Sequence, residues 1–190
     1  MSQLVKEIQA AEEEVLLGNV ILYPTDTVWG LGCDAENYEA VRKIFKIKER
    51  EESKSMILLV ADIDMLKHYV RNLPKGFEEM LQQQQRPTTY VFTSPQNLPK
   101  EVLANDGTVA IRIVKDEFCH RLIRQVSRAI VSTSANISGE PAPKSFKDIS
   151  EEIKKRVDFV VGWRQDDDMA ARPSRIVKIE ADGTQQVIRD

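Results

Sequence analysis

The sequence predicts an α/β fold with a mixed sheet, in which some neighbouring strands run parallel and others antiparallel. Segments with helical periodicity alternate with short apolar segments that are typical of strands. Some links between successive strands are too short for a helical crossover, which favours antiparallel pairs among parallel ones. No long linker rich in Pro, Gly or Ser divides the 190 residues. We therefore expect one domain over residues 1–190.

The expected helices follow from apolar residues spaced three or four positions apart. This spacing predicts a first helix over residues 2–17, which ends at Gly18 and Asn19. The same spacing predicts further helices over residues 37–50, 62–70, 75–85, 116–127 and 146–156.

The expected strands are short runs rich in β-branched and aromatic residues. The first has the sequence VILYP and covers residues 20–24. The others cover residues 55–61, 88–94, 108–114, 128–133, 157–162 and 174–180. Strands and helices alternate without a fixed period, so we expect no array of repeats.

Composition and charge narrow the class of protein. Hydrophobic residues make up 42% of the chain and charged residues 30%, which is typical of a soluble globular protein. The 27 basic and 30 acidic residues leave a net charge of −3, so any anion site must be local. No segment approaches the ~20 apolar residues that span a bilayer, and the N-terminal residues do not resemble a signal peptide. We expect a cytoplasmic protein that does not bind membranes.

The cysteines and histidines disfavour several common types of site. Cys33 and Cys119 each lack a second cysteine nearby, which argues against a disulfide framework or a zinc site. His68 and His120 lie in predicted helices without a Ser or Cys motif, so we expect surface or boundary residues and no catalytic triad. The common glycine-rich phosphate-binding motifs are absent. If the chain binds a nucleotide, other loops must hold it.

Polar and basic residues cluster at the ends of the predicted strands. PTDT (residues 24–27) follows the first strand, STSANISGEP begins at Ser132, and RPSR (residues 172–175) enters the last strand. Arg112 interrupts an apolar strand. In an open α/β sheet, ligands bind where loops leave the carboxyl ends of strands, so we expect several of these segments to meet in one crevice.

Each of these features also has an ordinary structural interpretation. Hydroxyl-rich clusters after a strand are usually turns that satisfy their own backbone. Arg112 is harder to explain in this way, because a buried or half-buried arginine needs an anionic partner, either a protein carboxylate or a ligand. A basic run interleaved with glutamates is usually a solvated helix face, and here the run comprises Lys43, Lys46, Lys48, Arg50 and Lys54.

Six segments together resemble the threonylcarbamoyl-AMP synthases, also called YrdC-like proteins. They are YPTDTVWGLGCDA, KIFKIKEREESKSM, RPTTYVF, TVAIRI, STSANISGEPAP and RPSRIV. They follow the order found in the family and span nearly the whole chain, which makes the resemblance specific. It implies an open, twisted sheet of mixed parallel and antiparallel strands with flanking helices around a basic cavity. That fold is related to the dihydroxybutanone phosphate synthase-like fold.

The resemblance implies a nucleotidyltransferase that joins L-threonine, bicarbonate and ATP into L-threonylcarbamoyladenylate and releases pyrophosphate. A threonylcarbamoyl transferase system would then modify an adenosine of tRNA. Mg²⁺ would accompany ATP without a dedicated protein site. We expect a monomer or a weak homodimer.

Two other functions compete with this one. The basic cavity could bind double-stranded RNA or tRNA without chemistry, although the net charge of −3 disfavours strong non-specific binding. A carbamoyl-adenylate-forming relative is the third possibility, but such proteins usually carry this domain inside much longer chains.

Matching the family's motifs residue by residue implies the site. Arg112 would bind the carboxylate of L-threonine, and Thr27, Ser132 and Ser174 would complete that pocket. Lys48, Arg50 and Arg112 would be the catalytic cations that stabilise charge on the reacting groups. ATP would contact Lys48, Arg50, Lys54, Thr108, Ser134, Ala142 and Arg189.

The chain departs from the family pattern at three places. Arg86 and Thr88 stand where the family commonly has a glycine and an aliphatic residue. The usual proline after the strand of Arg112 is absent. Arg189 lies in VIRD, where the family usually has LRPG. These changes would alter the rim of the cavity without removing its central residues.

The PTDTVWGLG segment places Thr25, Asp26 and Thr27 where an apolar strand would otherwise continue. We expect the strand to end in a ligand pocket, with Thr27 facing the amino acid. Gly30 and Gly32 would let backbone pass close by. Asp26 is open to two interpretations, because it can orient the loop or contact the substrate.

Overall fold

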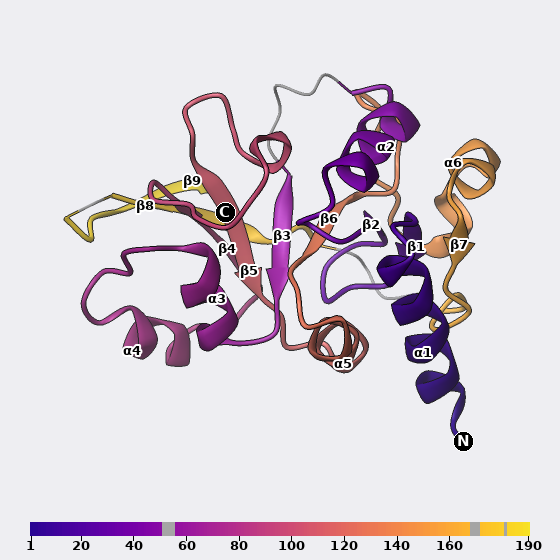
Figure 1. Cartoon of the computed structure of the whole chain (residues 1–190), viewed down its shortest axis with the longest axis horizontal. Helices are drawn as coiled ribbons and strands as arrows, with labels where there is room; N and C mark the ends of the chain where they lie inside the picture. Colours follow the sequence, from indigo (N-terminus) through magenta and orange to yellow (C-terminus); the bar gives the residue numbers. More distant parts are fainter. Residues whose placement is uncertain (51–55, 168–171, 181) are drawn as a thin grey trace.

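The computed structural model describes residues 1–50, 56–167, 172–180 and 182–190. The strands are β1 (Ile21–Tyr23), β2 (Gly30–Gly32), β3 (Ile57–Val60), β4 (Thr88–Phe92), β5 (Val109–Ile113), β6 (Ile130–Ser134), β7 (Phe159–Val160), β8 (Arg175–Ile179) and β9 (Gln185–Arg189). They form a nine-stranded sheet of order β7-β1-β2-β6-β3-β5-β4-β8-β9 (Figure 1). β3 and β5, β4 and β8, and β1 and β7 are parallel, and the other pairs are antiparallel. The predicted mixed sheet is confirmed.

Helices flank the sheet in the described part of the chain. They are α1 (Gln3–Leu16), α2 (Tyr38–Lys48), α3 (Ile63–Tyr69), α4 (Phe77–Gln82), α5 (Glu117–Val126) and α6 (Glu151–Arg156), with short 3₁₀ helices η1 (Lys100–Val102) and η2 (Phe146–Asp148). The side chains of Ser2, Asn37, Asp62 and Asp116 accept hydrogen bonds from first-turn N–H groups and so fix four helix starts. Within these residues, no helix is both long enough and apolar enough to cross a membrane.

The two faces of the sheet are covered differently, because side chains alternate along each strand. On one face, Leu58 and Val131 belong to a core that also takes in the apolar sides of α2, α3 and α4. On the other face, Leu59 and Ile130 pack against α1 and α5. Figure 1 shows α5 end-on, with α1 at one end of the molecule and the β8–β9 hairpin at the other. We call the face that carries α1 and α5 the cavity face.

Helical cover of the cavity face ends partway along the strands. Leu59 of β3 contacts the core of α5, whereas Ile57, two residues earlier on the same face, lines a cavity. Ala110 of β5 and Ser132 of β6 line the same cavity. The sheet therefore offers an uncovered region next to a well-packed one, and the candidate site lies there.

The sequence did not predict β2, because its residues are Gly30, Leu31 and Gly32. β2 nevertheless pairs with β1 and β6. A Cβ at Gly32 would lie 2.5 Å from the ring of Tyr23 and 2.8 Å from the carbonyl oxygen of Val131. Only glycine fits such an approach of side chain and neighbouring backbone, as the sequence interpretation expected.

Three other elements differ from the sequence prediction. β9 was not predicted, and both of its apolar residues are largely exposed, Val187 at 48% and Ile188 at 57%. The strand predicted over residues 157–162 contracts to β7. The helix predicted over residues 146–156 is divided into η2 and α6, because the Ser150 hydroxyl caps a new helix start at the N–H of Ile153.

Candidate functional site

A cavity of about 520 Å³ lies over the cavity face of the sheet. A transverse row of paired residues from five strands forms its floor: Ser132, Ile57, Ala110, Val91 and Lys178. The cavity thus lies near the carboxyl ends of β4 and β8, as the sequence predicted, but near the amino ends of β3 and β5. The reason is the partial helical cover, since α1 and α5 leave this region of the face open.

Most of the residues implied by the family resemblance line this one cavity. They are Thr27, Arg50, Thr108, Arg112, Ser132, Ser134, Ala142, Ser174 and Arg189. Lys48 is not in the cavity wall, and Lys54 lies outside the described residues. Folding therefore brings together side chains from the PTDT loop, the end of α2, and strands β5, β6, β8 and β9.

Arg112 is buried, with 2% of its surface exposed, in the middle of β5. Its Nη2 donates hydrogen bonds to Asp26 Oδ1 at 2.9 Å and to Thr27 Oγ1 at 3.2 Å. Its Nε is buried and has no hydrogen-bond partner among the described residues. A protein carboxylate therefore balances the charge, while the hydrogen bonds to Asp26 and Thr27 engage Nη2 alone among the guanidinium nitrogens.

Asp26, which the sequence left open, is the carboxylate partner of Arg112. Its side chain is only 13% exposed. Burial raises the pKa of Asp26, and the adjacent Arg112 guanidinium offsets part of that rise. Asp26 therefore orients a buried arginine through its bond to Nη2.

The hydroxyl of Thr25 fixes the shape of the PTDT loop. It donates to the carbonyl oxygen of Val28 at 2.7 Å and accepts from the N–H of Thr27 at 3.0 Å. These bonds form a tight loop at the end of β1. As a result, Thr27 lines the cavity and Asp26 lies behind it, against Arg112.

Hydrogen bonds to Ser174 hold the cavity wall formed by β8 and β9 in place. The hydroxyl oxygens of Ser174 and Thr89 lie 2.8 Å apart in the core. Arg189 donates to the carbonyl oxygen of Ser174 from Nη2 at 2.7 Å and from Nε at 3.0 Å. Burial and then the charge of Arg112 lower the pKa of Arg189. An anion in the cavity would meet an arginine that is already held in place.

Lys48 is buried and bonded to backbone. Its Nζ donates to the carbonyl oxygens of Ser134 and Asn136, the latter at 2.7 Å. Burial, followed by the charge of Arg50, lowers the pKa of Lys48 to about 8. The interpretation as a solvated helix face therefore suits Lys46, which is exposed, and is wrong for Lys48. Lys48 therefore holds the backbone of residues 134–136 in place at the end of β6.

The charge of the cavity wall is locally basic although the whole chain is acidic. Arg50, Arg112, Lys178 and Arg189 line it, against the carboxylate of Asp106 among the described lining residues. Burial lowers the pKa of Arg50. Basic side chains therefore outnumber carboxylates among the described residues of this wall.

A smaller cavity of about 190 Å³ adjoins the first, and Thr27, Val28 and Pro173 line both. Asp26 lines only the smaller cavity, and Arg112 lines only the larger one. The Arg112–Asp26 ion pair therefore lies in the wall that separates the two cavities. Arg86 and Lys144 line the smaller cavity, so the unusual Arg86 alters this rim and leaves the floor of the larger cavity intact.

Comparison with known proteins identifies the family. The family model Sua5_yciO_yrdC, described as "Telomere recombination", matches residues 14–190. The chain belongs to the Sua5/YciO/YrdC family. The threonylcarbamoyl-AMP synthase of Acinetobacter baumannii is 32% identical over 177 residues, which cover 90% of this chain and 92% of that protein. The threonylcarbamoyl-AMP synthase of Halorhodospira halophila is 32% identical over 158 residues, 83% of each chain.

Solved structures of the Sua5/YciO/YrdC family share the fold. P. abyssi Sua5 complexed with L-threonine is 26% identical and superposes with a TM-score of 0.84, covering 96% of this chain. This chain spans 53% of that protein's length, and 57% of a second P. abyssi Sua5 chain. E. coli YciO has a TM-score of 0.83 at 23% identity, with 100% of this chain and 91% of that one covered, and shows likeness of fold alone.

Within this family fold, sequence reasoning missed several residues of the cavity. Asp106 and Lys178 line it without belonging to a quoted motif, and Asp26 had no assigned partner. Alternation along β8 could have identified Lys178, since it shares the face of Ser174 and Ile176. No sequence signal could have paired Asp26 with a residue 86 positions away.

Proposed function

We propose that this member of the Sua5/YciO/YrdC family is a threonylcarbamoyl-AMP synthase. It would form L-threonylcarbamoyladenylate from L-threonine, bicarbonate and ATP and release pyrophosphate. The adenylate would pass to a threonylcarbamoyl transferase system that modifies an adenosine of tRNA. The A. baumannii and H. halophila relatives bear the synthase name, and P. abyssi Sua5 was solved with L-threonine.

The observation that carries the proposal is the convergence of the motif residues on one cavity. Three residues that the resemblance assigns to L-threonine line it, namely Thr27, Arg112 and Ser132. Arg50 and Ser134, which the resemblance assigns to ATP, line the same cavity. A volume of about 520 Å³ lies within the range of small-molecule sites. An amino acid with its carboxylate and a nucleotide with its phosphates could therefore bind side by side in this basic cavity.

The reaction needs positioning and charge stabilisation more than a protein nucleophile. The threonine amine attacks the carbon of bicarbonate, and loss of water leaves a carbamate. A carbamate oxygen then attacks the α-phosphorus of ATP, and the bond to pyrophosphate breaks. The Arg112 guanidinium would hold the threonine carboxylate beside Thr27, and Arg50 and Arg189 would neutralise phosphate oxygens as charge shifts to the leaving group.

Mg²⁺ would reach the site with ATP. In the described part of the chain, no three His, Cys, Asp or Glu side chains gather in a way that could hold a metal ion. Asp106, which lines the cavity, already accepts two hydrogen bonds from Thr108. Phosphate oxygens and water would therefore supply most of the ligands, as is usual for Mg²⁺ with a nucleotide.

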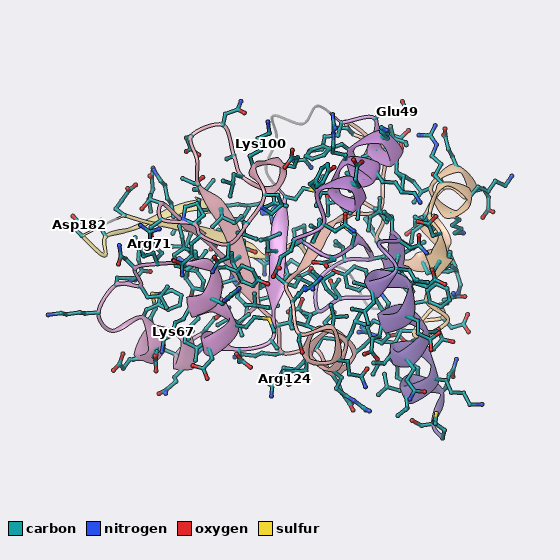
Figure 2. All side chains as sticks on the ribbon, viewed as in Figure 1. Glu49, Lys67, Arg71, Lys100, Arg124 and Asp182 are labelled. Atoms are coloured by element: carbon teal, nitrogen blue, oxygen red, sulfur yellow. The ribbon has the colours of Figure 1, made fainter. Side chains whose placement is uncertain are left out.

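The test is pyrophosphate release by the purified protein with each substrate omitted in turn. We expect release and an adenylate of the mass of threonylcarbamoyl-AMP only when L-threonine, bicarbonate and ATP are all present. Arg124→Gln is the matched control for arginine changes, because Arg124 lies on the outer side of α5, 61% exposed (Figure 2). Release that is independent of threonine, or none with all three substrates, contradicts the proposal.

A further inference from the structure

The tripeptide Asp-Gly-Thr occurs twice, at residues 106–108 and 182–184, and forms the same turn each time. Each glycine has a positive φ, +76° and +87°. In each turn the aspartate Oδ1 accepts a hydrogen bond from the threonine N–H, at 3.1 Å and 2.9 Å. The turn chemistry is therefore a local property of the tripeptide and needs no ligand to explain it.

The two turns differ in what they face. Thr108 is 7% exposed, precedes β5 and lines the cavity of about 520 Å³. Thr184 is exposed in the hairpin between β8 and β9, where Asp182 points outward (Figure 2). The threonine of the first copy thus faces the cavity, and the second copy, away from it, serves as an internal control.

The hydrogen bond between Thr108 and Asp106 fixes what the Thr108 hydroxyl can offer. The hydroxyl donates its single hydrogen to Asp106 Oδ1 at 2.7 Å. Hydrogen bonds from the Thr108 hydroxyl and then from its backbone N–H lower the pKa of Asp106, so the carboxylate is ionised at neutral pH and only accepts. The Thr108 oxygen therefore presents lone pairs alone, and a ligand atom that contacts it must be a hydrogen-bond donor.

Charge places the phosphates elsewhere in the cavity. The Asp106 carboxylate repels phosphate oxygens, and the nearby Lys178 is already paired with Glu180 at 3.0 Å. The guanidinium of Arg189, whose pKa is lowered by burial and then by the nearby charge of Arg112, offers a more favourable region for phosphate. A nucleotide would therefore point its neutral end toward Thr108.

The floor next to Thr108 suits an aromatic ring. Thr108, Ala110 and Arg112 alternate on one face of β5, so roughly 13 Å of strand separates the two polar ends. Between them, Ala110 and its strand partners Ile57 and Val91 give an apolar surface. The flat face of a purine can lie on this surface, because the surface has no polar side chain that the ring would leave without a hydrogen-bond partner.

We infer that the adenine of ATP lies at the Thr108 end of the cavity, where its 6-amino group donates a hydrogen bond to Thr108 Oγ1. Asp106 is then a positioning residue: by holding the hydroxyl hydrogen of Thr108, it makes the cavity select adenine over 6-oxopurines. The inference rests on the proposed function, which supplies ATP as the ligand. Hypoxanthine and guanine carry an oxygen at this position. Two acceptors would then face each other, which a site can reject strongly.

The test is equilibrium binding of ATP, ITP and 2′-deoxy-ATP, each with Mg²⁺, by calorimetry. We expect the wild-type protein to prefer ATP over ITP by about 10-fold or more. Asp106→Ala frees the hydroxyl to rotate and donate, so that preference should fall about 5-fold or more. Asp106→Asn keeps an acceptor oxygen and should retain most of the preference, and Asp182→Ala should leave it unchanged.

Four results would overturn the inference, and three of them concern ATP and ITP. These three are a wild-type preference below about 3-fold, an ATP-to-ITP ratio that Asp106→Ala leaves intact, and an equal loss in Asp182→Ala. A loss of discrimination against 2′-deoxy-ATP in place of ITP would move the contact to the ribose and also contradict it. Binding needs no turnover, so a protein that selects ATP yet releases no threonine-dependent pyrophosphate refutes the proposed function and leaves this inference standing.

Discussion

Lys48 and Arg112 are both buried cations that motif matching assigned to catalysis, yet their surroundings differ. Lys48 directs its ammonium to the carbonyl oxygens of Ser134 and Asn136. Arg112 is balanced by Asp26, keeps a buried Nε without a partner among the described residues, and lines the cavity. Burial alone therefore does not identify a catalytic cation. What separates the two is whether a donor is left over for a ligand.

The largest effect should follow loss of the arginine. Arg112→Gln removes the charge that would bind the threonine carboxylate, so kcat/KM for threonine should fall on the order of 100-fold or more. The fold should persist, because the raised pKa of Asp26 eases protonation of the carboxyl left behind. Pyrophosphate release and thermal unfolding measure the two effects. Wild-type turnover in this variant, with Arg124→Gln as control, contradicts the assignment of Arg112.

Lys48→Met should act chiefly on stability. It leaves two carbonyl oxygens without their buried donor, so the free energy of unfolding should fall by about 2 to 3 kcal/mol. Denaturant unfolding measures this loss. Lys46→Met, on the same helix but exposed, should change little. A Lys48→Met variant of unchanged stability but abolished ATP binding would place Lys48 with Arg112 as a ligand-binding cation.

The pH dependence of unfolding should report the lowered pKa of Lys48. Between about pH 8 and about pH 10.5 the unfolded chain binds this proton and the folded chain does not, so the contribution of Lys48 to stability rises with pH. The stability difference between wild type and Lys48→Met should therefore widen by about 1 to 2 kcal/mol from roughly pH 7.5 to roughly pH 9.5. A difference that stays flat or narrows contradicts a depressed pKa.

The smallest effect should follow Asp26→Asn. The amide keeps an acceptor for Arg112 Nη2 but removes the charge, so Arg112 should be held less firmly and the KM for threonine should rise about 3- to 10-fold. Turnover at saturation should change less, because Asp26 lies behind the substrate pocket. Steady-state kinetics separate the two parameters. A loss in kcat with KM unchanged would assign Asp26 to the chemical step.

Much of this architecture could be predicted from the sequence because its signals are local. Helical periodicity located α1, α2 and α5, and β-branched runs located the central strands. The glycine-built β2 and the exposed β9 lack such signals, since their pairing depends on neighbours distant in the chain. Most of the motif residues line one cavity as expected, but Lys48 does not, and its burial and the Asp26–Arg112 pair arise only from tertiary packing. Lys54 lies outside the described residues and stays a prediction.

The most direct test of the account is a crystal structure with ATP, Mg²⁺ and L-threonine. We expect the threonine carboxylate within hydrogen-bond distance of the Arg112 guanidinium, its flank against Thr27, with the Arg112–Asp26 pair intact. Threonine in the smaller cavity beside Lys144, or an Arg112 guanidinium that makes no contact with the bound amino acid, would contradict the central claim that this arginine is the substrate-binding cation.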